Sequence, residues 1–456
     1  MLRHAPVHGC HTSCRGASRL DKCDSKLEIA VSGMGNGVNE LKPWQSRLQW
    51  PLLLCVFLFG VTGMTMKGGA NIFLFLMTLF SLPLLKDARG DRWTWALFIV
   101  LSASLLVTVL QLAAGMSFVG HKALDAPTRF FLAALCLFAL KRLPARRLAT
   151  ACWGVWLGAL GVMVWGYVST HVAVYAYGLD VTRGWNQFSN PIPFGVFSVM
   201  LGFLSLSLPI VGWTDLSRKL QWLLCIGGLL AGLLAGYYSG SRAPFLIVPP
   251  LLIVMMLGVT RWRIGRIFVM LAVILAATAS SVMITPNKLH SRIDEGLNDL
   301  RVYKQNQNTS MGLRLEMWRV ARDIIADHPL TGVGKQGYYD EVNARIKQGK
   351  APVIINAAPH PHGELLNFGV EMGLPGLILG LLIFAVPAAL FFPLLRADDA
   401  LLRFAATGGS IVVVGQFVAG LMDTYFWIVS QTAFYGTFVV VFAAIILARR
   451  QELAGR

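Results

Sequence analysis

The sequence predicts an all-α, polytopic membrane protein with about twelve transmembrane helices and one large polar loop that forms helices of its own. Three observations support this prediction. Of the 456 residues, 55% are hydrophobic and only 14% are charged. The apolar runs are about twenty residues long, which is enough to cross a hydrocarbon core of about 30 Å. The runs are also continuous rather than alternating, so helices, and not barrel strands, must satisfy the backbone in lipid.

Hydropathy divides the chain into a polar tail over 1–47, helices over 48–285, a polar segment over 286–362, helices over 363–447 and a tail over 448–456. Nine spans are predicted before the polar segment and three after it: 48–66, 70–85, 93–115, 126–141, 148–168, 191–211, 221–237, 243–259, 264–285, 365–395, 402–421 and 425–447. The fourth span contains "PTRFFLAALCLFAL", which is short for a transmembrane helix, so we expect it to be tilted or interfacial.

The basic residues of the connecting loops predict which way the helices point, because short loops rich in Lys and Arg stay in the cytoplasm. Even-numbered connections carry clusters of positive charge, whereas the odd-numbered short connections hold at most one basic residue each: Lys67, Lys122, Arg183 and Arg242. Both termini are therefore predicted to be cytoplasmic. The same loops account for much of the net charge of +17, so this charge does not require a nucleic-acid partner.

The N-terminal tail contains the cluster "HGCHTSC", with His8, Cys10, His11 and Cys14. Four such ligands can bind zinc, but the tail has almost no apolar residues with which to build a scaffold around the ion. A disordered tail, or a translation start at Met34, is therefore the preferred interpretation. Four of the seven cysteines lie inside apolar runs, so no disulfide framework is predicted.

The polar segment over 286–362 is too long to be an idle connection, and the alternation of charge places it on the outer side of the membrane. It contains "SMGLRLEMWRVARDIIADHPLTGVG", in which apolar residues recur every three or four positions: Leu313, Met317, Val320, Ala321 and Ile324. This periodicity predicts an amphipathic helix that stops before Pro329. With a second short helix at "YYDEVNARIKQ", the segment is expected to form a helical cap on the outer mouth of the bundle.

Two arginines on the outer side are candidates for binding a phosphate-bearing group. Arg242 follows the small-residue turn "SGS" between two spans, where a charge at membrane depth costs about 2.5–3.5 kcal/mol unless it has a partner or water. Arg314 lies in the first turn of the cap helix, where its charge does not complement the helix dipole. Two guanidinium groups aimed at one cavity can bind phosphate oxygens in bidentate forks. The alternatives are that Arg242 snorkels at a helix end and that Arg314 is a solvated surface residue.

His362 lies where the cap meets the tenth span, in "HPHGELL", and imidazole is the side chain that most often changes charge near neutral pH. A structural histidine is one alternative, and a metal site of His360, His362 and Glu364 is another. Pro359 and Pro361 hold this strip extended, and the aspartate pairs lie in loops predicted to be cytoplasmic, so no metal is predicted. No cofactor is predicted either, since the chain lacks a "GxxxxGK[ST]" phosphate loop.

Three further residues on the predicted outer side are weaker candidates for the functional site. Trp318 can lie against a sugar or a lipid, Asp423 in "LMDTYF" can fix an arginine, and His360 neighbours His362 in the sequence. For Trp318 and Asp423, packing or anchoring at the membrane interface is the alternative explanation.

The segment "HPHGELLNFGVEMGLPG" resembles the histidine motif of the O-antigen ligase and polymerase superfamily, in which a histidine and a small polar residue precede nine free positions and G-x-x-G. His362 and Gly373–Gly376 match this pattern, whereas Gly363 stands where the family has Asn, Ser or Gln. The stretches "SGSRAPFL" and "GLRLEMWRVARDIIADHPLTGVG" are similar to the arginine-bearing turn and the cap of the same family. The resemblance covers the chain from about residue 48 onward.

The resemblance implies a glycosyltransferase of lipopolysaccharide biosynthesis in the bacterial cell inner membrane, with its active site on the periplasmic face. The implied donor is a glycan on undecaprenyl diphosphate, and the implied acceptor is a sugar hydroxyl of lipid A-core, both surrounded by membrane lipid. Arg242 and Arg314 would neutralise the leaving diphosphate, and His362 would take the proton of the acceptor hydroxyl as the general base. Direct displacement, without a metal, would invert the anomeric centre.

Other functions stay open. A polymerase of the same superfamily joins repeat units, and a protein O-oligosaccharyltransferase uses a Ser, Thr or Asn acceptor. Polymerases often carry two sizeable outer loops and this chain has one, which favours the ligase. A secondary transporter or lipid exporter also suits twelve spans, but such proteins usually have two halves of six spans, and here the long loop separates nine spans from three.

Overall fold

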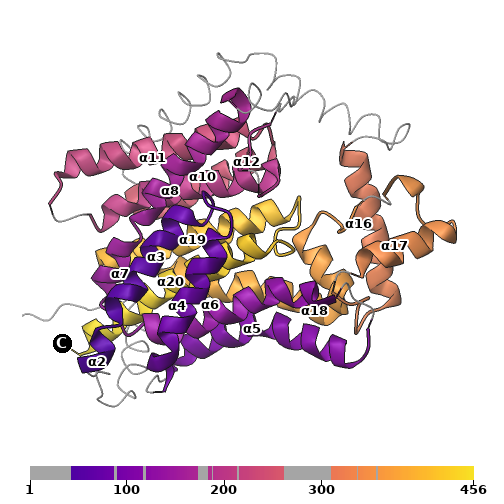
Figure 1. The fold of residues 1–456 in the computed structure, drawn as a ribbon, viewed down its shortest axis with the longest axis horizontal. Coiled ribbons are helices and arrows are strands. Elements are labelled where there is room, and N and C mark those ends of the chain that lie inside the picture. Colours follow the sequence, from indigo (N-terminus) through magenta and orange to yellow (C-terminus); the bar gives the residue numbers. More distant parts are fainter. Residues whose placement is uncertain are drawn as a thin grey trace, which may run out of the picture. The chain divides into compact units, whose positions relative to one another are not determined.

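The computed structural model describes residues 43–86, 90–116, 120–172, 183–186, 188–212, 215–260, 310–335, 337–355 and 358–455. The chain divides into two compact units, residues 41–449 and residues 1–40 with 450–456, and nearly all the described residues belong to the first. Every regular element in the described ranges is a helix, which confirms the all-α prediction (Figure 1). The "HGCHTSC" cluster, the predicted span over 264–285 and the start of the predicted cap, residues 286–309, lie outside the described residues.

The helices follow the predicted apolar runs. The α-helices are α2 (Pro43–Ser46), α3 (Gln49–Thr62), α4 (Gly69–Leu85), α5 (Arg92–Ala113), α6 (Asp125–Leu140), α7 (Ala145–Ala151), α8 (Gly154–Tyr167), α10 (Pro191–Ser207), α11 (Arg218–Tyr238), α12 (Ala243–Leu246), α13 (Val248–Met255), α16 (Ser310–Asp327), α17 (Tyr338–Lys347), α18 (Glu364–Phe391), α19 (Ala400–Gly420) and α20 (Val429–Ala454). Short 3-10 or π turns extend or join them: Gly120–Leu124, Val168–Val172, Leu208–Ile210, Met256–Thr260, Val353–Ile355 and Phe392–Leu394.

Eight helices in the described part of the chain are long and apolar enough to cross a membrane: Arg92–Ala113, Lys122–Leu140, Ala145–Val172, Pro191–Ile210, Arg218–Tyr238, Glu364–Leu394, Ala400–Gly420 and Val429–Ala454. Three shorter apolar helices, Gln49–Thr62, Gly69–Leu85 and Ala243–Gly258, coincide with three further predicted spans. The fourth predicted span reaches full length because the 3-10 turn Gly120–Leu124 precedes α6. The chain is therefore a multi-pass membrane protein by helix length and composition.

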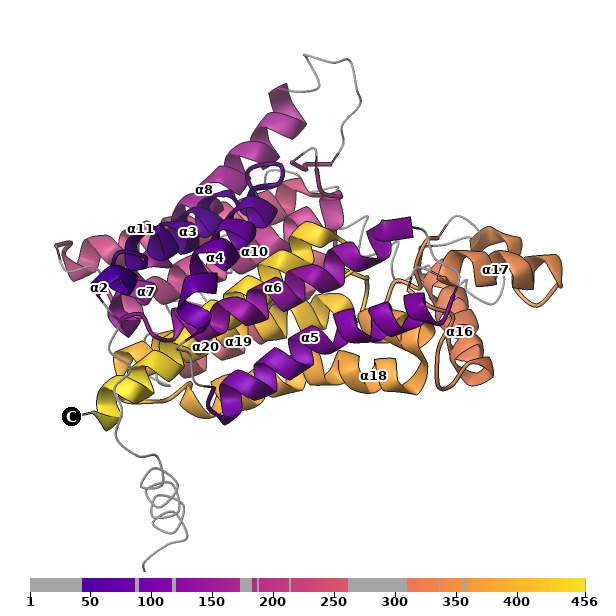
Figure 2. The same ribbon diagram turned by 60° about the horizontal axis from the view of Figure 1, so that its bottom comes forward.

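Helix α20 forms the centre of the bundle, and its whole apolar window is buried by its neighbours. Figure 2 shows α20 between α6 and α10. Aromatic rings fix this position, since ring centroids lie 4.7–6.1 Å apart, mostly edge to face, in pairs that join α20 to five helices: Phe59–Phe438, Phe197–Phe434, Phe130–Tyr435, Phe384–Tyr435 and Phe404–Phe442. In lipid, where apolar burial gives little driving force between helices, such shape-specific packing holds the bundle together.

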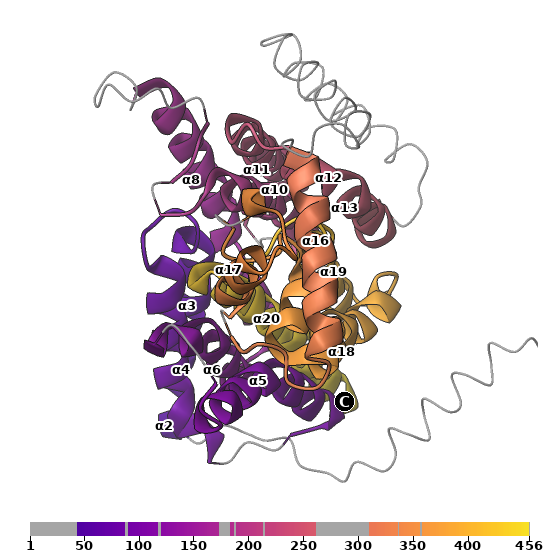
Figure 3. The same ribbon diagram turned by 90° about the vertical axis from the view of Figure 1, so that its right-hand side faces the viewer.

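The cap consists of α16 and α17, and α16 packs against α18 (Figure 3). The apolar face that the sequence predicts for α16 is the buried one, with Met317, Val320, Ala321 and Ile324 covered by Tyr338 and Val342 among others. Helix α16 ends at Asp327, two residues before Pro329, as predicted. The cap is therefore a small second core at one end of α18.

Helix α18 is broken at Gly373, whose φ of 68° and ψ of −153° are not helical. Residues of the cap form hydrogen bonds with the backbone of α18 on both sides of this break. The backbone N–H groups of Val333 and Gly334 donate to the carbonyls of Val370 and Glu371 at 2.9 and 3.1 Å, and Leu374 N–H donates to the carbonyl of Pro329 at 2.7 Å. A side chain at residue 373 would collide with this carbonyl, so the "GLPG" sequence is required for the cap to dock.

Candidate active site

His362 is held in a strained backbone conformation between the cap and the bundle. Its φ of 50° is the only positive value of a non-glycine residue in the described ranges. The left-handed conformation costs about 1–3 kcal/mol and persists only where neighbours enforce it. The indole N–H of Trp318 donates to the His362 carbonyl at 3.1 Å, and Gly363 N–H donates to Thr424 Oγ1 at 3.2 Å. The cap and the loop between α19 and α20 therefore hold the two ends of the single peptide group that joins His362 to Gly363.

The imidazole of His362 is paired with Asp423, whose Oδ1 lies 2.7 Å from Nδ1. Burial of Asp423 opposes its ionisation, but the hydrogen bond and the charge of His362 outweigh burial and hold the pKa of Asp423 below its usual value. An ionised carboxylate accepts a hydrogen bond only from an N–H group, so in the neutral imidazole Nδ1 carries the hydrogen and Nε2 has the lone pair. Of the alternatives for Asp423, packing, interfacial anchoring or contact with an arginine, none includes the partner that the structure shows, which is His362.

His360 lies beside this pair, with its ring centroid 4.5 Å from that of His362 and 5.8 Å from that of Trp427. Burial, assisted by the charge of His362, lowers the pKa of His360 to about 4, so its ring is neutral at physiological pH. Its Nδ1 is buried and has no hydrogen-bond partner within the described residues. His360 is therefore a neutral polar group whose buried Nδ1 lies beside the His362–Asp423 pair.

The metal alternative is not favoured by this geometry. The acidic group that joins His360 and His362 is Asp423 rather than Glu364, and one ligand atom from each of the three lies within 4.8 Å of the others. Two ligands bound to one tetrahedral zinc at about 2.0–2.1 Å are separated by about 3.3 Å. The 2.7 Å contact between His362 and Asp423 is shorter and fits a hydrogen bond.

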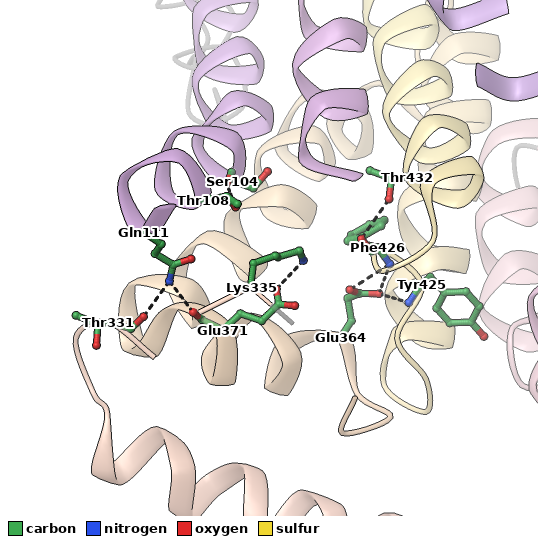
Figure 4. Close-up of polar contacts among 10 residues, drawn as sticks. All are labelled: Ser104, Thr108, Gln111, Thr331, Lys335, Glu364, Glu371, Tyr425, Phe426 and Thr432. Atoms are coloured by element: carbon green, nitrogen blue, oxygen red, sulfur yellow. Dashed lines mark hydrogen bonds and ion pairs between the residues drawn. The ribbon is translucent and has the colours of Figure 1, made fainter. Parts of the chain in front are cut away.

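Glu364 binds the loop that carries Asp423. Its carboxylate is buried and accepts hydrogen bonds from the backbone N–H groups of Tyr425 at 2.7 Å and Phe426 at 3.1 Å (Figure 4). The sequence analysis considered Glu364 only as a metal ligand and missed this role. The available signal was a carboxylate at the start of an apolar helix, where the chain must supply donors for it.

Arg314 and Trp318 lie one turn apart on α16 and share a face of the cap helix. Trp318 contacts His362, and the positive charge of Arg314 acts on the phenol of Tyr425, where it opposes the rise in pKa that burial causes. Arg314 is thus within electrostatic range of the loop that carries Asp423. Of the two arginines predicted to bind phosphate, Arg314 is therefore the one that acts on Tyr425, two residues after Asp423.

Arg242 is exposed and starts α12, directly after the turn formed by Ser239 and Ser241. Arg183, which the sequence analysis treated only as a loop charge, shapes this turn: its guanidinium donates to the Ser239 carbonyl at 3.1 Å and to Ser241 Oγ. The turn packs on α10, where Gly195 leaves room for Ser239. On the same helix, Phe197 lies 6.0 Å from Tyr425, ring centroid to ring centroid. Arg242 is therefore connected to the other candidates only indirectly among the described contacts. Its turn packs on the first turns of α10, and the same turns contact Tyr425.

Comparison with known proteins matches this part of the chain to a family. Residues 227–381, which include Arg242, Arg314 and His362, match the family described as O-antigen ligase. A protein of Haemophilus influenzae, described as uncharacterized, is 24% identical over 289 residues, which span 61% of this chain and 69% of the relative. Residues 227–381 are thus similar to the O-antigen ligase family, in a chain that is a multi-pass membrane protein by the length and composition of its helices.

Proposed function

We propose that this protein is an O-antigen ligase, which transfers a glycan from undecaprenyl diphosphate to a sugar hydroxyl of lipid A-core. The observation that carries the proposal is the Asp423–His362 hydrogen bond of 2.7 Å, which leaves Nε2 of His362 as a base at the end of the bundle covered by the cap. The family match supports a substrate of the lipid-linked glycan class. We place the site on the periplasmic face of the bacterial inner membrane, with both termini cytoplasmic.

The proposed reaction is a single displacement. The acceptor hydroxyl oxygen attacks the anomeric carbon of the donor while His362 Nε2 takes the hydroxyl proton, and the bond from the anomeric carbon to the diphosphate oxygen breaks. Asp423 stabilises the imidazolium that forms. Arg242 and Arg314 neutralise the negative charge that develops on the departing diphosphate. Attack from the face opposite the leaving group inverts the anomeric configuration, and no metal is required.

His360 and Trp318 complete the proposed site without exchanging protons. The neutral ring of His360 can bond an acceptor hydroxyl, and Trp318 can present its ring to a sugar while its N–H holds the His362 carbonyl. A positioned general base contributes about 10²–10⁴-fold to the rate. This range sets the size of the effect expected from removing His362.

A reconstituted transfer assay tests the function. Purified protein in lipid nanodiscs is given the lipid-linked glycan together with rough lipopolysaccharide, with a serine-containing acceptor peptide, or alone. The ligase proposal predicts that glycan appears on lipid A-core only. Elongation of the donor in the absence of a core acceptor would establish a polymerase, and glycan on the peptide would establish a protein O-oligosaccharyltransferase. Movement of intact donor across the bilayer without transfer would establish an exporter.

A further inference from the structure

Glu364 is a buried carboxylate that serves a neighbouring loop instead of its own helix. It is the first residue of α18 and only 1% exposed. The cap position of α18 is taken by Gly363, which has no side chain for capping. A buried carboxylate is tolerated only when donors surround it. The donors here are two consecutive backbone N–H groups of the loop between α19 and α20, those of Tyr425 and Phe426.

The contacts between this loop and the start of α18 pair successive residues of the two segments one to one. His362 bonds to Asp423, Gly363 to Thr424 and Glu364 to Tyr425, so each residue of the first strip meets the residue 61 positions later. Two strips joined at three successive positions lie side by side. The Glu364 contact is the most buried of the three and the only one in which a side chain of the first strip binds backbone N–H groups of the other strip.

The surroundings of Glu364 hold it in place. On α19, Gly420 packs against it, since a side-chain carbon on Gly420 would lie 3.0 Å from Glu364 Cβ. Lys335 of the cap and Glu371 of α18 form a buried ion pair of 2.6 Å close by, and both exert electrostatic effects on Glu364 (Figure 4). The cap, α18 and α19 thus fix the carboxylate, and the carboxylate fixes the loop.

The loop position matters because Asp423 lies two residues before the first bonded N–H. Asp423 Oδ1 also accepts the N–H of Thr424 at 2.9 Å, so rotation of the Thr424 or Tyr425 peptide would move the carboxylate that orients His362. A side chain that anchors these peptide groups therefore controls the distance between Asp423 and His362.

We propose that Glu364 is a positioning residue for the transfer reaction: it holds residues 423–426 so that Asp423 stays bonded to Nδ1 of His362. This inference rests on the proposed function. Glu364 itself does not contact substrate; it acts through Asp423, and Asp423 acts through His362. The charged and titratable groups that face His362 are Asp423, its neighbour His360, and, across Tyr425, Arg314 of the cap.

The test compares Glu364→Gln with the wild-type protein in nanodiscs. The amide keeps the size of the side chain but replaces one acceptor oxygen with a donor that faces backbone N–H groups. We expect kcat for transfer to fall about tenfold, the KM for the donor to stay within about twofold, and the acid limb of the pH profile to move to lower pH as the carboxylate partner of His362 is displaced. Glu316→Gln is the matched control, because Glu316 is also a buried glutamate but pairs with Arg319 in the cap. It should leave the pH profile unchanged.

A readout independent of activity separates this inference from the proposed function. With ¹⁵N-labelled histidine, the imidazole of wild-type His362 should show one tautomer, protonated at Nδ1, and Glu364→Gln should show a mixture. Glu364→Asp, which keeps the carboxyl group but withdraws it by one methylene, should give an intermediate result and serves if the glutamine variant does not fold. Wild-type tautomer and pH profile in a variant that has lost only thermal stability would overturn the inference. The inference would also be overturned if Glu364→Gln and Glu364→Asp both failed to fold while Glu316→Gln folded. A tautomer shift in a protein that transfers no glycan would instead overturn the function alone.

Discussion

The two ends of the helix bundle bury charged residues in different ways. The far end is the end at which α5 and α19 begin. There Asp91 caps α5 through the N–H groups of Trp93 and Thr94 and pairs with the buried Lys141 at 3.1 Å. Likewise, Asp399 caps α19 and pairs with Arg449 of α20 at 2.7 Å. These carboxylates join a helix start to an opposite charge, which is a structural use.

The site end is the end at which His362 and Asp423 meet. Here Asp423 and Glu364 bind a histidine and loop N–H groups instead of capping helices, and His362 is strained. The hydroxyl of Tyr425 and Nδ1 of His360 are buried without a hydrogen-bond partner among the described residues. The carboxylates at the far end thus cap helices and pair with cations, whereas those at the site end bind a histidine and loop N–H groups.

The largest effect is expected when the base is removed. His362→Ala should lower the transfer rate about 10³-fold, because the acceptor hydroxyl then loses its proton acceptor. Asp399→Asn at the far end should transfer glycan at the wild-type rate per folded molecule. Initial rates on matched amounts of folded protein measure both, and equal losses in the two variants would remove the distinction between the ends.

At the far end, the expected loss is in stability. Asp91→Ala removes the cap of α5 and leaves the ammonium of Lys141, 3% exposed, without its carboxylate. The expected destabilisation is about 3 kcal/mol. Thermal unfolding in detergent measures it, and Asp91→Asn, which can still cap the helix, should lose less. A loss of turnover in protein that remains folded would contradict a purely structural role.

Removing the partner of the base should have a smaller effect on transfer. Asp423→Asn should reduce kcat about 10–100-fold and move the acid limb of the pH profile about one unit lower. The sign follows from the low pKa of Asp423: the residue is ionised across the working range, its charge favours the imidazolium, and without it His362 takes up its proton only at lower pH. Asp327→Asn is the control, because the pKa of Asp327 is lowered mainly by Arg345, with smaller contributions from His328 and Lys350, and not by His362. An equal shift of the pH profile in Asp327→Asn would contradict the proposed role of the Asp423–His362 pair in the reaction.

The smallest effect is expected where charge is kept and geometry is changed. Arg314→Lys should lower kcat/KM about tenfold, because an ammonium cannot bind two phosphate oxygens as a planar fork does. Arg322→Lys on the same helix, 75% exposed, is the matched control and should behave as wild type. Titration with the lipid-linked donor measures the difference. An unchanged kcat/KM for Arg314→Lys would remove Arg314 from the diphosphate site.

The sequence was sufficient for the helices because the information that defines them is local. Apolar length predicted the membrane helices, and a periodicity of three and four predicted the buried face of α16 from Met317 to Ile324. The charge pattern of the loops also predicted an orientation, which stays a prediction. The motif at His362 identified the strip where the site lies, because a histidine and glycines at fixed spacing are visible without a fold.

The pairing of distant loops was not visible in the sequence. Asp423 is a candidate from the sequence, but its histidine partner is not, since nothing in the spacing of one sequence shows that strips 61 residues apart lie side by side. Glu364 and Arg183 were missed for the same reason: each acts on a loop that comes near it only in the folded chain. Long-range contacts of this kind are set by packing and not by local pattern.

The most direct measurement is a cryo-electron microscopy structure of the protein in nanodiscs with a phosphonate analogue of the lipid-linked donor, which cannot be transferred. The account predicts the diphosphate group between Arg242 and Arg314, with the anomeric carbon facing Nε2 of His362 and the Asp423–His362 hydrogen bond intact. A diphosphate bound at the far end near Lys141, or a His362 ring turned away from the donor, would contradict it.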